Sequence, residues 1–85
     1  MYKITNNSIS FLRDYNETSF CEIIQNHNET NETKIDEIEF GKDFNQDIFF
    51  LPRYITKITF DKYSKFNKKY VFIYRYKINW RYDIL

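Results

Sequence analysis

Few side chains in this 85-residue chain are suited to catalysis or metal binding. Cys21 and His27 are the only cysteine and histidine, and together they are the minimum for a nucleophile and its general base. No third residue that would orient the histidine is indicated, and a lone cysteine is more often a buried apolar residue. A zinc site needs about four nitrogen or sulfur ligands, which this chain lacks. We therefore expect no enzyme activity, no metal site and no cofactor.

The acidic and basic side chains are separated along the chain. Residues 1–50 hold ten acidic and four basic side chains, a net charge of −6, and residues 51–85 hold nine basic and two acidic ones, a net charge of +7. The carboxylates between 29 and 47 lack the spacing of a calcium loop, and the single glycine excludes a glycine-rich phosphate loop. The separation indicates either a fold whose halves neutralise each other or a basic half that attracts a partner.

The basic half is the candidate partner-binding region. Its cations are Arg53, Lys57, Lys62, Lys65, Lys68, Lys69, Arg75, Lys77 and Arg81. Cations beside the aromatic residues of 70–82 are typical of a groove for single-stranded nucleic acid. The alternation in 70–82, however, places the aromatics on one face of a strand and the cations on the other, as in a half-buried strand with an aromatic core. Residues 53–81 therefore predict a protein partner, with nucleic acid as the alternative.

Short strands are the main elements available to position these residues. Alternating apolar residues and turn residues predict strands within 2–15 (two, joined at Asn6-Asn7-Ser8), at 35–40, at 55–60 and over 70–82. Residues 26–33 predict a polar loop. Only Glu17–Gln25 carries a helical signal, with Thr18 or Ser19 as its N-cap.

An Ile-x-(Phe/Trp) pair recurs at Ile9, Ile38, Ile58 and Ile78, with spacings of 29, 20 and 20 residues. Spacings of about 20 lie at the lower edge of leucine-rich repeats, and the polar loop 26–33 accounts for the longer first spacing as an insertion. A Phe or Tyr comes a few residues after such a pair, and the side chain of the Asn that directly follows it can form hydrogen bonds with backbone groups of the turn. The pattern predicts a mainly β fold, a short stack of leucine-rich-like repeats. A small α+β domain with an antiparallel sheet is the alternative, and either fold is one domain over 1–85.

Residues 35–60 resemble the FNIP repeat family. Its repeats carry Leu-Pro, a strand that ends in Leu-x-Phe-Gly, and then Phe-Asn-Gln/Ile-Pro. The matching residues here are Ile38-Glu39-Phe40-Gly41, Phe44-Asn45-Gln46, Leu51-Pro52 and Ile55-Thr56-Lys57-Ile58-Thr59-Phe60. Asp47 stands where the family usually has Pro, and Phe66-Asn67 comes two positions late. The resemblance implies leucine-rich-like repeats that act in protein–protein recognition, in a family abundant in social amoebae and giant amoebal viruses. The F-box that often accompanies these repeats is not visible.

Together these observations predict a non-catalytic protein–protein interaction module in the cytoplasm, including that of an infected host cell. No leader and no apolar run of spanning length is visible, so we expect no membrane contact, and the lone cysteine fits a reducing compartment. One alternative is a small viral or phage inhibitor whose acidic residues, 29–47, imitate a phosphate backbone at a host protein or nucleoprotein complex. Another is a nucleic-acid-binding protein that uses the basic half. Self-association is a further alternative, because fewer than about three repeats rarely stand alone.

Overall fold

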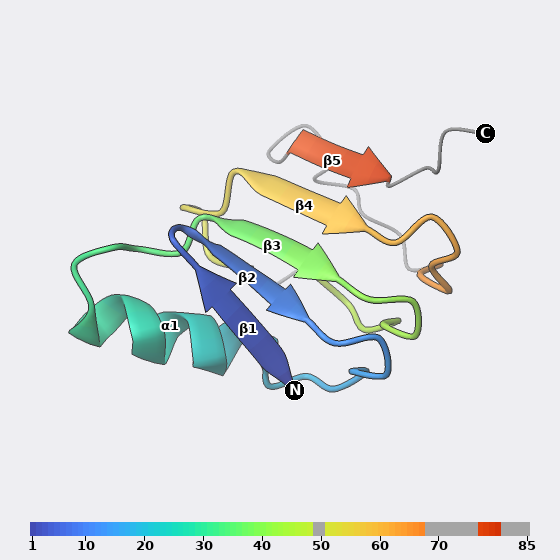
Figure 1. Cartoon of the computed structure of the whole chain (residues 1–85), viewed down its shortest axis with the longest axis horizontal. Coiled ribbons are helices and arrows are strands. Elements are labelled where there is room, and N and C mark those ends of the chain that lie inside the picture. Colours follow the sequence, from blue (N-terminus) through green and yellow to red (C-terminus); the bar gives the residue numbers. More distant parts are fainter. Residues whose placement is uncertain (49–50, 68–76, 81–85) are drawn as a thin grey trace.

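The computed structural model describes residues 1–48 and 51–67 and the backbone of 77–80. These residues form one helix and a five-stranded sheet (Figure 1). In chain order, the elements are β1 (Tyr2–Thr5), β2 (Ser8–Phe11), α1 (Phe20–Thr30), β3 (Glu37–Phe40), β4 (Lys57–Phe60) and β5 (Lys77–Trp80).

The strands lie in the sheet in the order in which they occur in the chain, β1-β2-β3-β4-β5. β1 and β2 form an antiparallel hairpin whose turn contains Asn6, with a φ of 55° that Asn tolerates better than most residues. β2, β3, β4 and β5 are parallel neighbours, and their register pairs the Ile of each Ile-x-(Phe/Trp) segment with the next Ile. The recurring segments therefore occupy equivalent places in one sheet.

Stacked aromatic side chains form the core on the inner face of the sheet. The rings of Phe11, Phe40 and Phe60 stack in one row, with centroid separations of 5.7 and 5.9 Å. The rings of Tyr15, Phe44 and Phe66, from the turns that follow these strands, form a second row with separations of 6.3 and 6.1 Å. All six side chains are buried. Because each buried aromatic ring removes roughly 150–250 Å² from water, these rows supply much of the stability of a small chain.

Three asparagines connect the turns beneath the aromatic rows. The Asn45 backbone N–H donates to the Asn16 side-chain oxygen at 2.8 Å, and the Asn67 N–H donates to the Asn45 side-chain oxygen at 3.0 Å. The third turn has two more residues between Phe60 and Phe66 than the second has between Phe40 and Phe44. The extra residues lie in the turn, and Asn67 keeps its place in the row.

Helix α1 packs on the same inner face, with Phe20 and Ile24 buried. The ring of Phe20 meets those of Phe40 and Phe44 edge-on, at centroid distances of 5.4 and 5.3 Å. These are favourable edge-to-face contacts, and they attach the helix to the sheet near the junction of the two aromatic rows.

The second half of α1 is polar, and it is held by side-chain hydrogen bonds. The Asn28 side chain accepts from the Ile35 N–H at 2.7 Å and donates to the Ile35 carbonyl at 3.0 Å, so it joins the helix to the segment before β3. The helix therefore reaches Thr30, inside the segment 26–33 that the sequence predicts as a polar loop.

The expected fold class, a mainly β stack of leucine-rich-like repeats, is wrong. The structure is a small α+β domain in which helix α1 connects β2 to β3, while the described residues of the β3–β4 connection contain no helix. The sheet is open and mixed, because β1 runs antiparallel to the others. The alternative, a small α+β domain with an antiparallel sheet, is right in its class and wrong in its sheet, because β2, β3, β4 and β5 pair in parallel. Of the segment 26–33, which the sequence predicts as an inserted loop, residues 26–30 form the last part of α1, whose first half packs into the core through Phe20 and Ile24.

Gly41 lies where two neighbouring turns approach each other closely. A Cβ atom at this position would lie 2.7 Å from the Arg13 Cα and 2.7 Å from the Leu12 carbonyl oxygen, both backbone atoms that cannot rotate away. We expect Gly41→Ala to lower the free energy of unfolding by about 1–3 kcal/mol, measured by chemical denaturation. Glu29→Ala, at an exposed position of α1, is the control and should change it little. Equal stability of Gly41→Ala and the wild type would contradict the close approach.

Asn45 is the central member of the asparagine row. Asn45→Ala removes the acceptor of the Asn67 N–H, so we expect it to cost about 1 kcal/mol of unfolding free energy. Asn45→Asp keeps an oxygen at the same place and should retain most of that stability. Chemical denaturation of both variants measures this contribution. An equal loss of unfolding free energy in the two variants would show that the side-chain oxygen at position 45, as acceptor of the Asn67 N–H, does not stabilise the fold.

Candidate interaction surface

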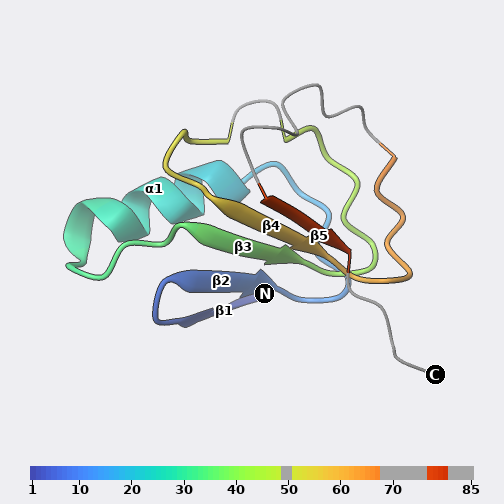
Figure 2. The same cartoon turned by 90° about the horizontal axis from the view of Figure 1, so that it is seen from above.

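The polar side chains of the strands share the face of the sheet opposite the core. Figure 2 shows α1 and the described parts of the loops that follow β2, β3 and β4 on one side of the sheet. The outer face, as we call the opposite side, carries Lys3, Thr5, Ser8, Ser10, Glu37, Glu39, Lys57 and Thr59, all of them partly or fully exposed. These residues share one face because successive side chains of a strand point to opposite sides of the sheet, and each of them alternates with a residue of the inner face.

The strand register orders the outer face into two rows. One row runs Ser8, Glu37, Lys57, and the other runs Ser10, Glu39, Thr59, each across neighbouring parallel strands. Strands lie about 4.8 Å apart, so adjacent members of a row are near neighbours. Glu37 thus stands beside Lys57, and the face mixes both signs of charge with hydroxyl groups.

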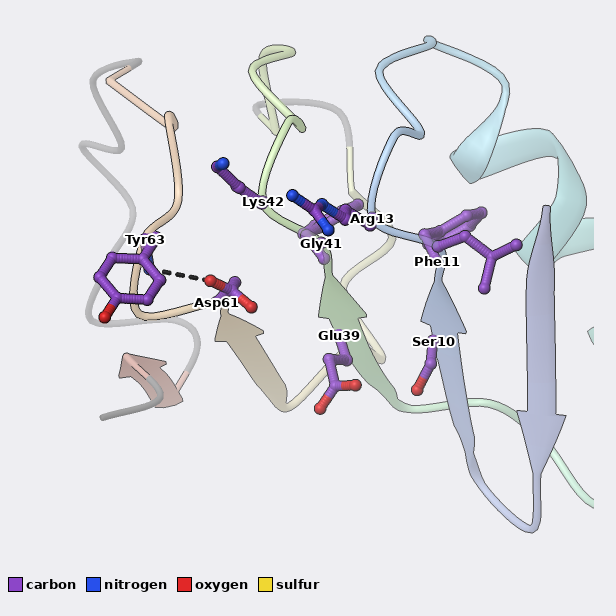
Figure 3. A pocket seen from close by; sticks show the side chains of 10 residues that line it. Ser10, Phe11, Arg13, Glu39, Gly41, Lys42, Asp61 and Tyr63 are labelled. Atoms are coloured by element: carbon purple, nitrogen blue, oxygen red, sulfur yellow. Dashed lines mark hydrogen bonds between the residues drawn. The ribbon is translucent and has the colours of Figure 1, made fainter. Parts of the chain in front are cut away.

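An open groove of about 600 Å³ lies where β2, β3 and β4 end. Ser10 and Glu39 line it from the outer face, and Arg13 and Lys42 line it from the turns after β2 and β3 (Figure 3). Asp61 and Tyr63 line it from the turn after β4, where the Asp61 carboxylate accepts the Tyr63 N–H at 2.8 Å. The groove continues the outer face and adds charged and aromatic groups to it.

The structure separates the cations that the sequence indicated as contact residues. Arg53 is exposed in the loop before β4, Lys57 is on the outer face, and Lys62 and Lys65 follow β4. Lys65 pairs with Asp43 at 3.3 Å, and the Lys62 ammonium lies 4.4 Å from the centroid of the Tyr63 ring. Lys68, Lys69, Arg75 and Arg81 lie outside the described residues, and only the backbone of Lys77 is described. The described members thus lie at both ends of β4 and do not form one basic patch.

Sequence reasoning missed the charged residues contributed by the first half of the chain. Arg13, Lys42, Glu37 and Glu39 all belong to the outer face or the groove. A signal for two of them was present, because the alignment of the Ile-x-(Phe/Trp) pairs puts a cation four residues after Ile9, Ile38 and Ile58, at Arg13, Lys42 and Lys62.

Cys21 and His27 do not form a nucleophile–base arrangement. They are six positions apart in α1, which separates them by about 9 Å along the helix axis. The ring nitrogens of His27 face the Thr33 carbonyl oxygen at 3.2 Å and the Asn31 amide nitrogen at 3.3 Å. Burial raises the pKa of the Cys21 thiol to about 11, which opposes formation of a thiolate at neutral pH.

Across residues 1–48 and 51–67, no group of three or more His, Cys, Asp and Glu side chains is arranged to hold a metal ion. Within the described chain, no helix has the length and apolar character needed to cross a bilayer.

Comparison with known proteins finds no relative. No protein-family model, no curated protein and no solved structure matches the chain. The resemblance of 35–60 to FNIP repeats therefore stays a prediction.

The raised pKa of Cys21 predicts that its thiol is alkylated slowly at neutral pH. We expect iodoacetamide to alkylate the native protein at neutral pH at least about tenfold more slowly than the denatured protein, because the thiolate is the reactive form. The native rate should rise with pH toward about 11. Mass spectrometry of timed samples measures the alkylation rates of the native and the denatured protein. Equal rates at neutral pH would contradict a raised pKa of the Cys21 thiol in the folded chain.

Proposed function

We propose that this chain is a non-catalytic protein–protein interaction module that binds its partner on the outer face and the adjoining groove. The observation that carries the proposal is the outer face itself, on which partly exposed polar side chains from neighbouring strands stand in register. Side chains on paired strands have fixed positions, so they can present a defined pattern of donors, acceptors and charges.

The mixture of charges on this surface favours a protein partner over nucleic acid. Glu37 and Glu39 stand on the same face as Lys57, and Asp61 lines the same groove as Arg13. A phosphate backbone is attracted by an excess of cations, and these carboxylates would repel it. Surfaces that carry positive and negative side chains in a fixed arrangement are typical of proteins that select one protein partner and reject others.

Two features of the sequence support the same proposal. The segment 35–60 that resembles FNIP repeats contains β3 and β4, which carry half of the outer-face residues. The single cysteine leaves no intramolecular disulfide to form, so we place the module in a reducing intracellular compartment.

Charge reversal on the outer face tests the proposal. The wild-type chain is used as bait in an extract of its native cells, and the partners it retains are compared with those of Glu37→Lys and of Glu22→Lys. Glu37 lies on the outer face and Glu22 on the exposed side of α1, so the two variants change charge equally at different places. We expect Glu37→Lys to lose a partner, with at least about a tenfold drop in recovery, that Glu22→Lys retains.

Circular dichroism of both variants checks that the fold is kept. A partner that both variants retain equally would place the interaction elsewhere on the molecule. Release of all partners by nuclease treatment would point to nucleic acid instead.

A further inference from the structure

Three cations occupy equivalent places along the edge of the sheet where β2, β3 and β4 end. Arg13, Lys42 and Lys62, which we call the cation rim, each lie in the turn directly after one of these strands. Backbone hydrogen bonds hold the turns side by side: the Asp43 N–H donates to the Arg13 carbonyl at 3.0 Å, and the Lys65 N–H donates to the Lys42 carbonyl at 2.9 Å. The rim thus crosses the direction of the strands, as the rows of the outer face do.

Two members of the rim are available to a ligand. Within residues 1–48 and 51–67, neither Arg13 nor Lys42 takes part in an ion pair. Lys65, which follows on the next turn, is by contrast paired with Asp43. Like charges held on neighbouring turns repel each other, so an anion placed between Arg13 and Lys42 is favoured.

Exposed apolar side chains flank these cations. Leu12 is 51% exposed and Tyr63 is 66% exposed, and both line the groove that Arg13 and Lys42 line. The combination of Arg, Tyr and an exposed aliphatic side chain is typical of a protein-binding site rather than of a site for a small inorganic anion.

We propose that the cation rim binds an acidic segment of a protein partner, with carboxylates over Arg13 and Lys42 and an apolar side chain against Leu12 or Tyr63. This inference rests on the proposed function and names the chemistry of the partner. Glu39 and Asp61 line the groove, and Asp14 and Asp43 follow Arg13 and Lys42 in the turns. These carboxylates disfavour a continuous polyanion such as nucleic acid more strongly than a segment in which apolar side chains separate the carboxylates, because the second carries fewer negative charges over the same length.

A synthetic peptide tests this inference directly. The probe is a short fluorescent peptide in which Glu alternates with Leu, and the matched control peptide has Gln in place of each Glu. Fluorescence anisotropy at low ionic strength should show binding of the Glu peptide that weakens as salt is added, and at least about tenfold weaker binding of the Gln peptide. Absence of binding of the Glu peptide would overturn the inference.

Matched variants of the full chain locate the binding. Arg13→Glu should weaken binding of the Glu peptide about tenfold, and Arg53→Glu, the same change at another exposed arginine, should leave it unchanged. Leu12→Ser should weaken it as well, since it removes the apolar contact. Equal effects of Arg13→Glu and Arg53→Glu would overturn the inference, because binding would then follow net charge alone.

Competition separates this inference from nucleic-acid binding and from the proposed function. A single-stranded oligonucleotide that binds more tightly than the Glu peptide, and loses affinity with Arg13→Glu, would overturn the acidic-protein assignment. If Glu37→Lys loses a cellular partner that Arg13→Glu still binds, the proposed function holds and the cation rim is not its contact. If neither variant changes any partner, the proposed function fails too.

Discussion

The packing of Phe40 against Phe44 is the contact on which the rest of the structure depends. Their ring centroids lie 3.7 Å apart, and both rings are fully buried. Phe40 belongs to the row that crosses the strands, and Phe44 to the row that crosses the turns. Phe20 of α1 meets both of them edge-on. One contact therefore joins the sheet, the turns and the helix into a single core, which a chain of this size needs in order to bury enough apolar surface.

The surface charges follow from that core. Because alternate residues of each strand must face the aromatic rows, the residues between them face outward in register. The turns after the strands are stacked by backbone hydrogen bonds, so a residue type that recurs at one turn position forms a line across the molecule. The outer face and the cation rim are thus produced by the same stacking that forms the core, and a substitution in the core would disturb both.

The distribution of charge in space differs from its distribution along the chain. The acidic first half and basic second half predict either a fold whose halves neutralise each other or a basic surface made by 53–81. In the described residues, β3 brings Glu37 beside Lys57 of β4, and Asp43 pairs with Lys65. Parallel pairing of strands that are 20 residues apart mixes the halves, and the cations best placed for an acidic partner, Arg13 and Lys42, come from the half with net negative charge.

The local pattern of the chain was sufficient to predict the first hairpin, the short strands that contain Ile38–Phe40 and Ile58–Phe60, and the role of an Asn in the turns. These features depend on period-two alternation and on turn chemistry, which are properties of a few neighbouring residues. Only the tertiary structure decided the fold class. Helix α1 is polar over its second half, and its stability there comes from Asn28 bonding Ile35 and from the packing of Phe20 against two distant rings. Such contacts between residues far apart in the chain leave no periodic signal. The helical signal at Glu17–Gln25 therefore stopped short of the end of α1 at Thr30, and the mixed sheet and the groove that Arg13 and Lys42 share became visible only once the chain was folded.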